Sequence, residues 1–195
     1  MKVLIDNGHG VDTAGKRSPD GSLREYKYTR EIAARVVAEL KKQGCDAEQL
    51  VPEEDDISIR ERCRRVNEIC SSEGARNVLL VSVHCNAAGD GSGWMNARGW
   101  SAHVSLNAST NSKIFARRLI AAAEGEGLKV RKYAQQVPYW PQNLAICRDT
   151  KCPSVLTENL FQDNREDVAF LLSDEGKEVI TALHVNGIMS YIKEG

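Results

Sequence analysis

Two histidines and two glutamates in the chain have the residue types and positions suited to metal chemistry. His9 lies three residues after the apolar run KVLID, His84 directly follows the run NVLLVSV, and Glu158 ends the run SVLTE. Glu25 follows a loop rich in glycine, aspartate and serine. Catalytic zinc sites use imidazole nitrogens and carboxylate oxygens as three protein ligands and leave a fourth position for water. A further carboxylate can then transfer protons.

The elements expected around these residues bring them to one edge of a sheet. Short apolar runs alternate with longer helical patterns, which is typical of an α/β layer fold with a mainly parallel sheet. The carboxyl ends of parallel strands share one edge, where ligands gather. His9, His84 and Glu158 follow or end strands at that edge. Glu25 lies in the first turn of the next helix, on the face it shares with Val36, which should contact the sheet.

Each of the four residues also has an ordinary structural explanation. Ser22 and Glu25 match the S-x-x-E capping box, so Glu25 could serve only the start of its helix. His84 could be a core histidine, Glu158 an ordinary carboxylate at a strand end, and His9 a surface residue of a loop. Their common position at one edge favours a joint function over four separate explanations.

Hydrophobic periodicity predicts the elements along the chain. Strands are expected at 2–6, 77–83, 99–106, 127–131 and 154–158, and helices at about 22–43, 58–73, 111–124 and 165–193, the last with a break near 173–174. The alternation in 99–106 predicts one wet face, on which His103 would lie, and His184 falls inside the last helix. We expect both histidines to be structural, and the arginines of 58–73 to form a solvated face.

The composition is that of an ordinary globular domain. The chain has 195 residues, of which 42% are hydrophobic and 27% charged, so a single domain is expected. Its 26 Lys and Arg against 27 Asp and Glu give a net charge of -1, which argues against nucleic acid or an anionic membrane as main partner. The first apolar run is too short for a signal peptide, and no later run is long enough for a membrane span. The six cysteines contain no C-x-x-C pair, which argues against a cysteine zinc site.

Two loops gather aromatic side chains. The loop 86–98 carries Trp94, and the loop 133–143 carries two tyrosines, Trp140 and two prolines. Such aromatics either form the walls of a ligand groove or pack locally under the loop, and the sequence leaves both explanations open.

Five segments of the chain resemble the motifs of a known family. IDNGHG, LREYKYTREIA, SVHCNA, the ARG at 97–99 and LAICRDTKCPSVLTENLFQDN look like the motifs of the zinc N-acetylmuramoyl-L-alanine amidases of the type 3 amidase family, in the same order. The resemblance implies that His9, Glu25 and His84 are zinc ligands and that Glu158 is the catalytic glutamate. It also implies a single three-layer α/β domain, with a twisted, mostly parallel sheet of about six strands flanked by helices.

The activity implied by the resemblance is hydrolysis of the amide between N-acetylmuramic acid and L-alanine in peptidoglycan, with Zn²⁺ as cofactor. Residues 1–195 would form one catalytic domain without a separate wall-binding module, and a monomer is expected. The protein would act on the cell wall, either as a phage lysin made in the cytoplasm and then released, or after export as part of a longer precursor. A zinc carboxy- or aminopeptidase and a non-catalytic wall-binding module are the alternatives; the order of the motifs favours the amidase.

The chain departs from the family pattern at a few positions. Asn7 stands where proline is usual, Thr29 where asparagine is common, and Asn159 with Leu160 where a pair of small residues is usual. None is at a ligand position, but together they leave the shape of the pocket beside Glu158 open. An oxyanion-stabilising residue is not evident: Arg148 is a candidate whose ordinary explanation is a surface arginine.

Overall fold

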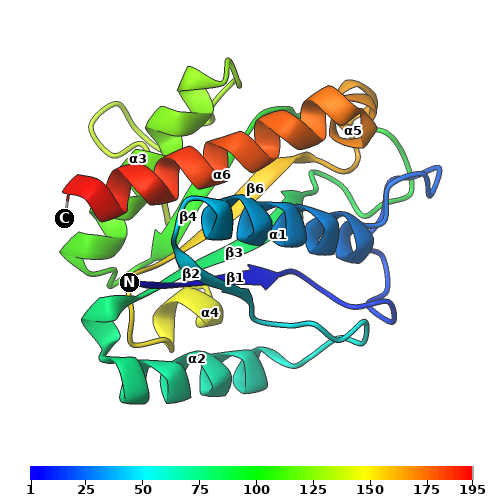
Figure 1. The fold of residues 1–195 in the computed structure, drawn as a ribbon. Coiled ribbons are helices and arrows are strands. Elements are labelled where there is room, and N and C mark those ends of the chain that lie inside the picture. Colours follow the sequence, from blue (N-terminus) through cyan, green and yellow to red (C-terminus); the bar gives the residue numbers. More distant parts are fainter. Residues whose placement is uncertain (195) are drawn as a thin grey trace.

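The computed structural model describes residues 1–194, in which strands alternate with helices along most of the chain (Figure 1). None of the helices in this range has both the length and the apolar composition needed to cross a membrane. The elements are β1 (Lys2–Asn7), α1 (Glu25–Lys42), β2 (Asp46–Gln49), α2 (Ile59–Glu73), the 3₁₀ helix η1 (Ala75–Asn77), β3 (Val78–Asn86), β4 (Ser101–Ser105), α3 (Thr110–Gly125), β5 (Trp140–Gln142), α4 (Ala145–Arg148), β6 (Ser154–Phe161), α5 (Arg165–Leu172) and α6 (Asp174–Glu194).

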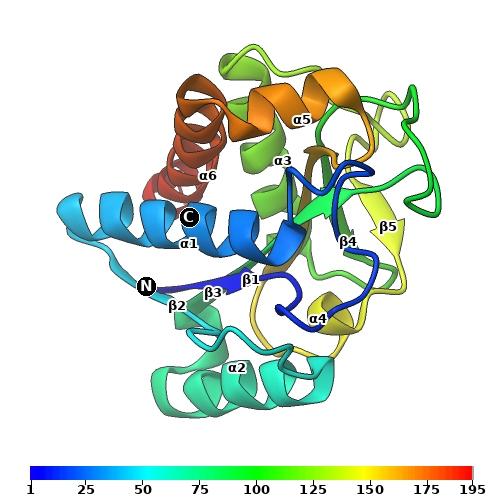
Figure 2. The ribbon, with the colours of Figure 1, turned by 90° about the vertical axis from the view of Figure 1, so that its right-hand side faces the viewer.

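The strands form one six-stranded sheet in the order β2-β1-β3-β6-β4-β5. The pairings β1–β2, β1–β3, β3–β6 and β4–β5 are parallel, and β4–β6 is antiparallel. Helices α1, α3, α5 and α6 lie on one side of the sheet, and α2 and α4 on the other (Figures 1 and 2). The predicted three-layer α/β fold with a mostly parallel sheet is therefore confirmed.

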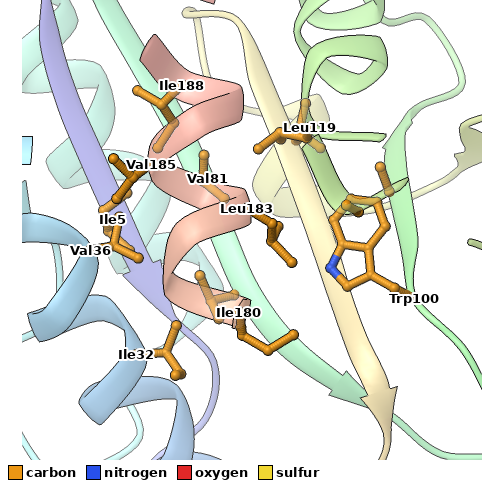
Figure 3. Close-up of a cluster of buried hydrophobic side chains, with 14 of the residues drawn as sticks. Ile5, Ile32, Val36, Val81, Trp100, Leu119, Ile180, Leu183, Val185 and Ile188 are labelled. Atoms are coloured by element: carbon orange, nitrogen blue, oxygen red, sulfur yellow. The ribbon is translucent and has the colours of Figure 1, made fainter. Parts of the chain in front are cut away.

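Two hydrophobic cores lie on the two faces of the central strands. Because successive strand residues point to opposite faces, Ile5 of β1 packs into the larger core, with α1, α3, α5 and α6, while Leu4 packs into the smaller core, with α2 and α4. Figure 3 shows Ile5 and Val81 meeting side chains of α1 and α6 in the larger core. Burial on both faces explains why β1 and β3 are almost continuous apolar runs.

The prediction that one face of 99–106 is exposed to solvent was wrong. Every residue of β4 is buried, because β4 lies between β6 and β5 and contacts both α3 and α4. His103 is only 6% exposed, and its ring is hydrogen-bonded to Ser101 Oγ (2.9 Å) and Gln142 Oε1 (3.0 Å). The polar residues that alternate with the apolar ones in this strand are thus buried, and the ring of His103 is hydrogen-bonded on both nitrogens.

Other differences concern short elements. The strand predicted at 127–131 is absent from the described residues except for an isolated bridge between Val130 and Trp100. The two shortest strands, β2 and β5, were not predicted, because neither has an apolar alternation of useful length. The predicted break in the last helix is confirmed at Ser173, which ends α5 before α6 begins.

Candidate metal centre

Three of the four residues selected from the sequence come together at the carboxyl ends of β1 and β3. One ligand atom from each of His9, Glu25 and His84 lies within 4.8 Å of the other two. Glu25 Oε1 is 3.5 Å from His9 Nε2 and 3.2 Å from His84 Nδ1. The two imidazole rings meet edge to face, with their centroids 5.0 Å apart. Two nitrogens and a carboxylate form a donor set that suits Zn²⁺.

Glu25 begins α1 but does not cap it. The helix has no side-chain cap, and Ser22 Oγ donates to Asp20 Oδ1 instead (2.8 Å), so the predicted capping box was wrong. The Glu25 side chain is fully buried, and its Oε1 accepts from the backbone amide of Cys85 (2.9 Å). Its Oε2 is buried without a hydrogen-bond partner among residues 1–194. An unpartnered buried carboxylate oxygen is costly, and a bound cation would satisfy it.

His9 lies in the loop after β1 with a left-handed backbone (φ 63). Its carbonyl oxygen accepts from Arg30 Nη1 (2.8 Å) and Arg62 Nη2 (3.4 Å). Arg62 was predicted on a solvated face, which was wrong: it is buried, and its Nη1 donates to Asp6 Oδ1 and to the Asn7 carbonyl, both at 2.6 Å. Two cationic side chains therefore hold the main chain that orients His9.

His84 lies inside β3, which continues to Asn86 instead of ending at the histidine. Its ring packs directly on Gly8, where a Cβ atom would come within 2.4 Å of His84 Cε1. The His84 carbonyl accepts from Asn159 Nδ2 (2.9 Å), and Asn159 Oδ1 accepts from Trp100 Nε1 (2.8 Å). Asn159, one of the departures from the family pattern, thus ties β6 to the main chain of His84.

Burial and the charges of neighbouring groups shift the pKa values of all three residues. Burial lowers the pKa of His9 to about 4, which leaves its imidazole neutral at neutral pH. Burial alone would raise the pKa of Glu25, but the hydrogen bond and charge of His84, the charge of His9 and the Cys85 amide together lower it. Burial would likewise lower the pKa of His84, but the hydrogen bond and charge of Glu25 and the charge of Glu158 raise it. Glu25 is therefore favoured as an ionised carboxylate and His9 as a neutral imidazole, whereas Glu25 and Glu158 favour the protonated form of His84, and a bound cation would have to displace that proton.

Glu158 lies on β6 directly opposite His84 in the parallel pairing of β3 with β6. Its Oε2 is buried without a hydrogen-bond partner in the described part of the chain. Burial raises the pKa of Glu158 to about 7, against the opposing charge of His84. The carboxyl group borders a cavity of about 260 Å³, whose other lining residues are Asn86, His103, Arg131, Trp140 and Gln142.

The remaining candidates from the sequence have different surroundings. Trp140 lines the cavity beside Glu158, whereas Trp94 packs on the larger core with the guanidinium of Arg165 4.5 Å from its ring centroid. Each of the two open explanations for loop aromatics thus applies to one tryptophan. Arg148 is exposed and paired with Asp149, so its contacts give no support for an oxyanion role. The sequence does not identify Arg131, because a single arginine at the end of the strand predicted at 127–131 has no pattern that would distinguish it.

A profile of N-acetylmuramoyl-L-alanine amidases matches residues 3–190 of the chain. The chain belongs to this family. It is 27% identical over 187 residues to the endolysin of Bacillus phage SPP1, covering 95% of this chain and 64% of the endolysin. It is also 27% identical over 190 residues to the N-acetylmuramoyl-L-alanine amidase CwlM of Bacillus licheniformis, covering 96% of this chain and 67% of CwlM. The chain thus spans about two thirds of the length of these members of the amidase family.

Solved structures of the amidase family share the fold. The amidase Ami1 from Mycobacterium smegmatis superimposes with a TM-score of 0.85 at 21% identity, covering 100% of this chain and 98% of Ami1. An amidase from Clostridium difficile 630 gives a TM-score of 0.82 at 24% identity, covering 98% of this chain and 96% of that protein. The six-stranded sheet and its flanking helices are therefore the architecture of these family structures.

Proposed function

We propose that the chain is the zinc-dependent catalytic domain of a peptidoglycan amidase, which hydrolyses the bond between N-acetylmuramic acid and L-alanine. His9, Glu25 and His84 would hold Zn²⁺, and Glu158 would transfer protons. The observation that carries the proposal is the buried carboxylate of Glu25, whose Oε1 lies 3.5 Å from His9 Nε2 and 3.2 Å from His84 Nδ1 and whose Oε2 has no hydrogen-bond partner within residues 1–194, in a chain matched to the amidase family over residues 3–190. Peptidoglycan is accordingly the proposed partner and the cell wall the proposed place of action.

Amide hydrolysis requires activation of the carbonyl group for attack by water and protonation of the leaving nitrogen. Zn²⁺ held by the three ligands would polarise the scissile carbonyl and bring the pKa of a bound water toward about 7. Glu158 is suited to take the proton of the attacking water and to deliver it to the leaving nitrogen, because its pKa of about 7 lies close to a neutral working pH. Without that delivery the nitrogen would have to leave as an amide anion, which is a poor leaving group.

The replacement Glu158→Gln tests the proposal, because it keeps the size of the side chain and removes the proton acceptor. We expect one zinc per chain, as in the parent protein, and muropeptide hydrolysis slower by at least about 100-fold, the low end of what acid–base catalysis supplies. Metal content and release of L-alanine amino termini are measured on the same preparation. Glu73→Gln, at the exposed end of α2, is the matched control and should keep full activity.

Three other outcomes would contradict the proposal in different ways. Loss of zinc together with activity would make Glu158 a fourth ligand. Unchanged activity and unchanged zinc would remove Glu158 from the reaction. Cleavage of plain L-alanyl peptides at rates equal to those for muropeptides would favour a zinc peptidase over an amidase.

A further inference from the structure

A cavity that contains Arg131 lies beside Glu158 and is also lined by His103 of β4 and by Trp140 and Gln142 of β5. We propose that Arg131 in this cavity binds a free carboxylate of the peptide that leaves in the reaction, and so makes the enzyme select substrates that carry this carboxylate. The inference rests on the proposed amidase function and adds a specificity-determining residue to it.

Arg131 is held rigidly by its surroundings. Its backbone amide donates to the Trp100 carbonyl (2.7 Å), and its carbonyl accepts from Trp140 Nε1 (2.9 Å). The guanidinium carbon lies 5.7 Å from the ring centroid of Trp140 and 4.8 Å from that of Phe161. Gly99 leaves room for the aliphatic part of the Arg131 side chain, since a Cβ atom at Gly99 would come within 3.1 Å of Arg131 Cγ. An arginine fixed in this way loses little entropy when it binds a ligand.

The guanidinium of Arg131 forms no ion pair with any of the described residues. Within residues 1–194 it forms neither an ion pair nor a side-chain hydrogen bond, whereas the buried Arg62 and the partly exposed Arg98 both pair with carboxylates. Glu158 borders the same cavity, and the charge of Arg131 opposes the rise in the pKa of Glu158, but the two side chains form no hydrogen bond or ion pair. A planar guanidinium left with its donors free matches a carboxylate, which accepts two parallel hydrogen bonds.

The neutral residues of the cavity add further donors. Gln142 Oε1 is engaged by His103 Nδ1, and Asn86 Oδ1 accepts from the Ala87 amide, which leaves the amide nitrogens of both side chains without a partner in the described residues. Burial keeps His103 neutral, with its pKa lowered to about 4. Beside the Glu158 carboxyl group, whose pKa is raised to about 7, the cavity therefore combines one fixed cation with free N–H groups, an arrangement suited to a ligand group that only accepts hydrogen bonds.

The position of the cavity determines which part of the substrate can reach it. Glu158 must lie at the scissile amide if it protonates the leaving nitrogen, and Arg131 shares its cavity of about 260 Å³. The bound carboxylate is therefore close to the scissile bond in the leaving peptide. In a stem that continues from L-alanine to γ-linked D-glutamate, two carboxylates are candidates: the α-carboxylate of this glutamate and the carboxyl terminus of the peptide.

The test compares four muramoyl tripeptides: both carboxylates free, only the glutamate α-carboxylate amidated, only the carboxyl terminus amidated, and both amidated. For the parent protein we expect amidation of one carboxylate to lower kcat/KM by about 10- to 100-fold, mainly through KM, as for hydrogen bonds to a charged group. For Arg131→Met we expect kcat/KM on the substrate with free carboxylates to fall to the value that the parent protein shows on the amidated substrate. Amidation should then have no further effect on kcat/KM. Arg131→Lys keeps the positive charge but cannot donate two parallel hydrogen bonds. Its preference for the free carboxylate should lie between those of the parent protein and Arg131→Met.

Control variants separate this inference from the function on which it rests. Lys132→Met removes the same charge from the next residue, whose amine pairs with Glu124 (2.6 Å) outside the cavity, and should keep the full preference for the carboxylate. Glu158→Gln should slow all four substrates by the same factor. Zinc content and thermal stability of Arg131→Met and Arg131→Lys show that the variants are folded.

Two results would overturn the inference. Equal losses by Arg131→Met on free and fully amidated substrates would show that Arg131 does not recognise the carboxylate, even if the amidase activity is confirmed. A parent protein that neither binds nor hydrolyses any of the four muropeptides would refute the proposed function, and the inference with it.

Discussion

The side chain of Glu25 is completely buried, yet only one of its two oxygens has partners. Oε1 accepts from the Cys85 amide and faces His84 Nδ1, whereas Oε2 has none among residues 1–194. Burying a charged group without full compensation is unfavourable. Glu25 contributes nothing to capping α1, and the proposed binding of Zn²⁺ would give Oε2 the partner that it lacks.

Replacement of Glu25 by glutamine tests this at the scale of one residue. Glu25→Gln keeps an oxygen for the Cys85 amide and removes the charge. We expect zinc affinity to fall by at least about 100-fold, because even outer-shell partners of zinc ligands are worth 10- to 100-fold. Chelator competition measures the affinity, and Glu39→Gln on the same helix, where the glutamate pairs with Lys42, is the control. Unchanged zinc affinity in Glu25→Gln would exclude Glu25 as a ligand.

At the scale of elements, the site depends on the adjacent strands β1, β3 and β6. Their order places the loop after β1 beside the end of β3, and the β3–β6 pairing sets His84 opposite Glu158. Much of this could be predicted from the sequence, because long apolar runs identify buried parallel strands and the carboxyl ends of such strands share one edge. The meeting of His9 and His84 follows from these two rules, and Glu25 joins them because it lies on the face of α1 that packs on the sheet.

The parts that could not be predicted depend on contacts between distant segments. Arg62 follows the helical pattern of its arginine neighbours, and only the packing of α2 under β1 brings it to Asp6. The polar residues of β4 look solvent-facing in sequence, because the pattern cannot show that α3 and α4 cover both faces of the strand. Arg131 ends the segment 127–131, which was predicted as a strand but forms only an isolated bridge, and the pattern gives no indication that Arg131 approaches Trp140 and Phe161.

The buried ion pair between Arg62 and Asp6 gives a prediction at this scale. Both side chains are at most 2% exposed, and Ser82 Oγ donates to the other oxygen of Asp6 (2.5 Å). Arg62→Met leaves a buried carboxylate without its cation, so we expect a loss of about 3–5 kcal/mol in the free energy of unfolding. Urea denaturation measures the loss. The exposed Arg60→Met on the same helix should change stability by no more than about 0.5 kcal/mol, and a loss of that size in Arg62→Met would contradict the assigned role of the pair.

At the scale of the whole molecule, α6 joins the helices that cover one side of the sheet. It packs against α1, α3 and α5 (Figure 1), and its residues Ile180, Leu183 and Ile188 belong to the larger core (Figure 3). His184 lies among them, fully buried: its Nδ1 donates to the Ile180 carbonyl (2.7 Å), and its Nε2 is 2.9 Å from Thr157 Oγ1 of β6. A polar link thus joins α6 to the central sheet inside an apolar core.

The buried position of His184 makes the stability of the molecule depend on pH. Burial lowers its pKa from 6.5 to about 4, so the unfolded chain takes up a proton at a higher pH than the folded protein does. The stabilising contribution is therefore complete above about pH 6.5 and is lost as the pH falls from 6.5 toward 4. His9 and His103, whose pKa values are also lowered to about 4, add to the same trend.

The contribution of His184 can be isolated by comparing the parent protein with His184→Gln, both free of metal in the presence of chelator. Between pH 7.5 and pH 5 the parent protein should lose about 2 kcal/mol more unfolding free energy than the variant, the amount that a group with these two pKa values supplies over this range. Urea denaturation at the two pH values gives the difference, and any loss common to both pH values cancels. As a control, replacement of the exposed Lys113 on α3 by glutamine should leave the pH dependence of the unfolding free energy unchanged. An equal pH dependence in parent and His184→Gln would show that His184 does not titrate as a buried neutral group.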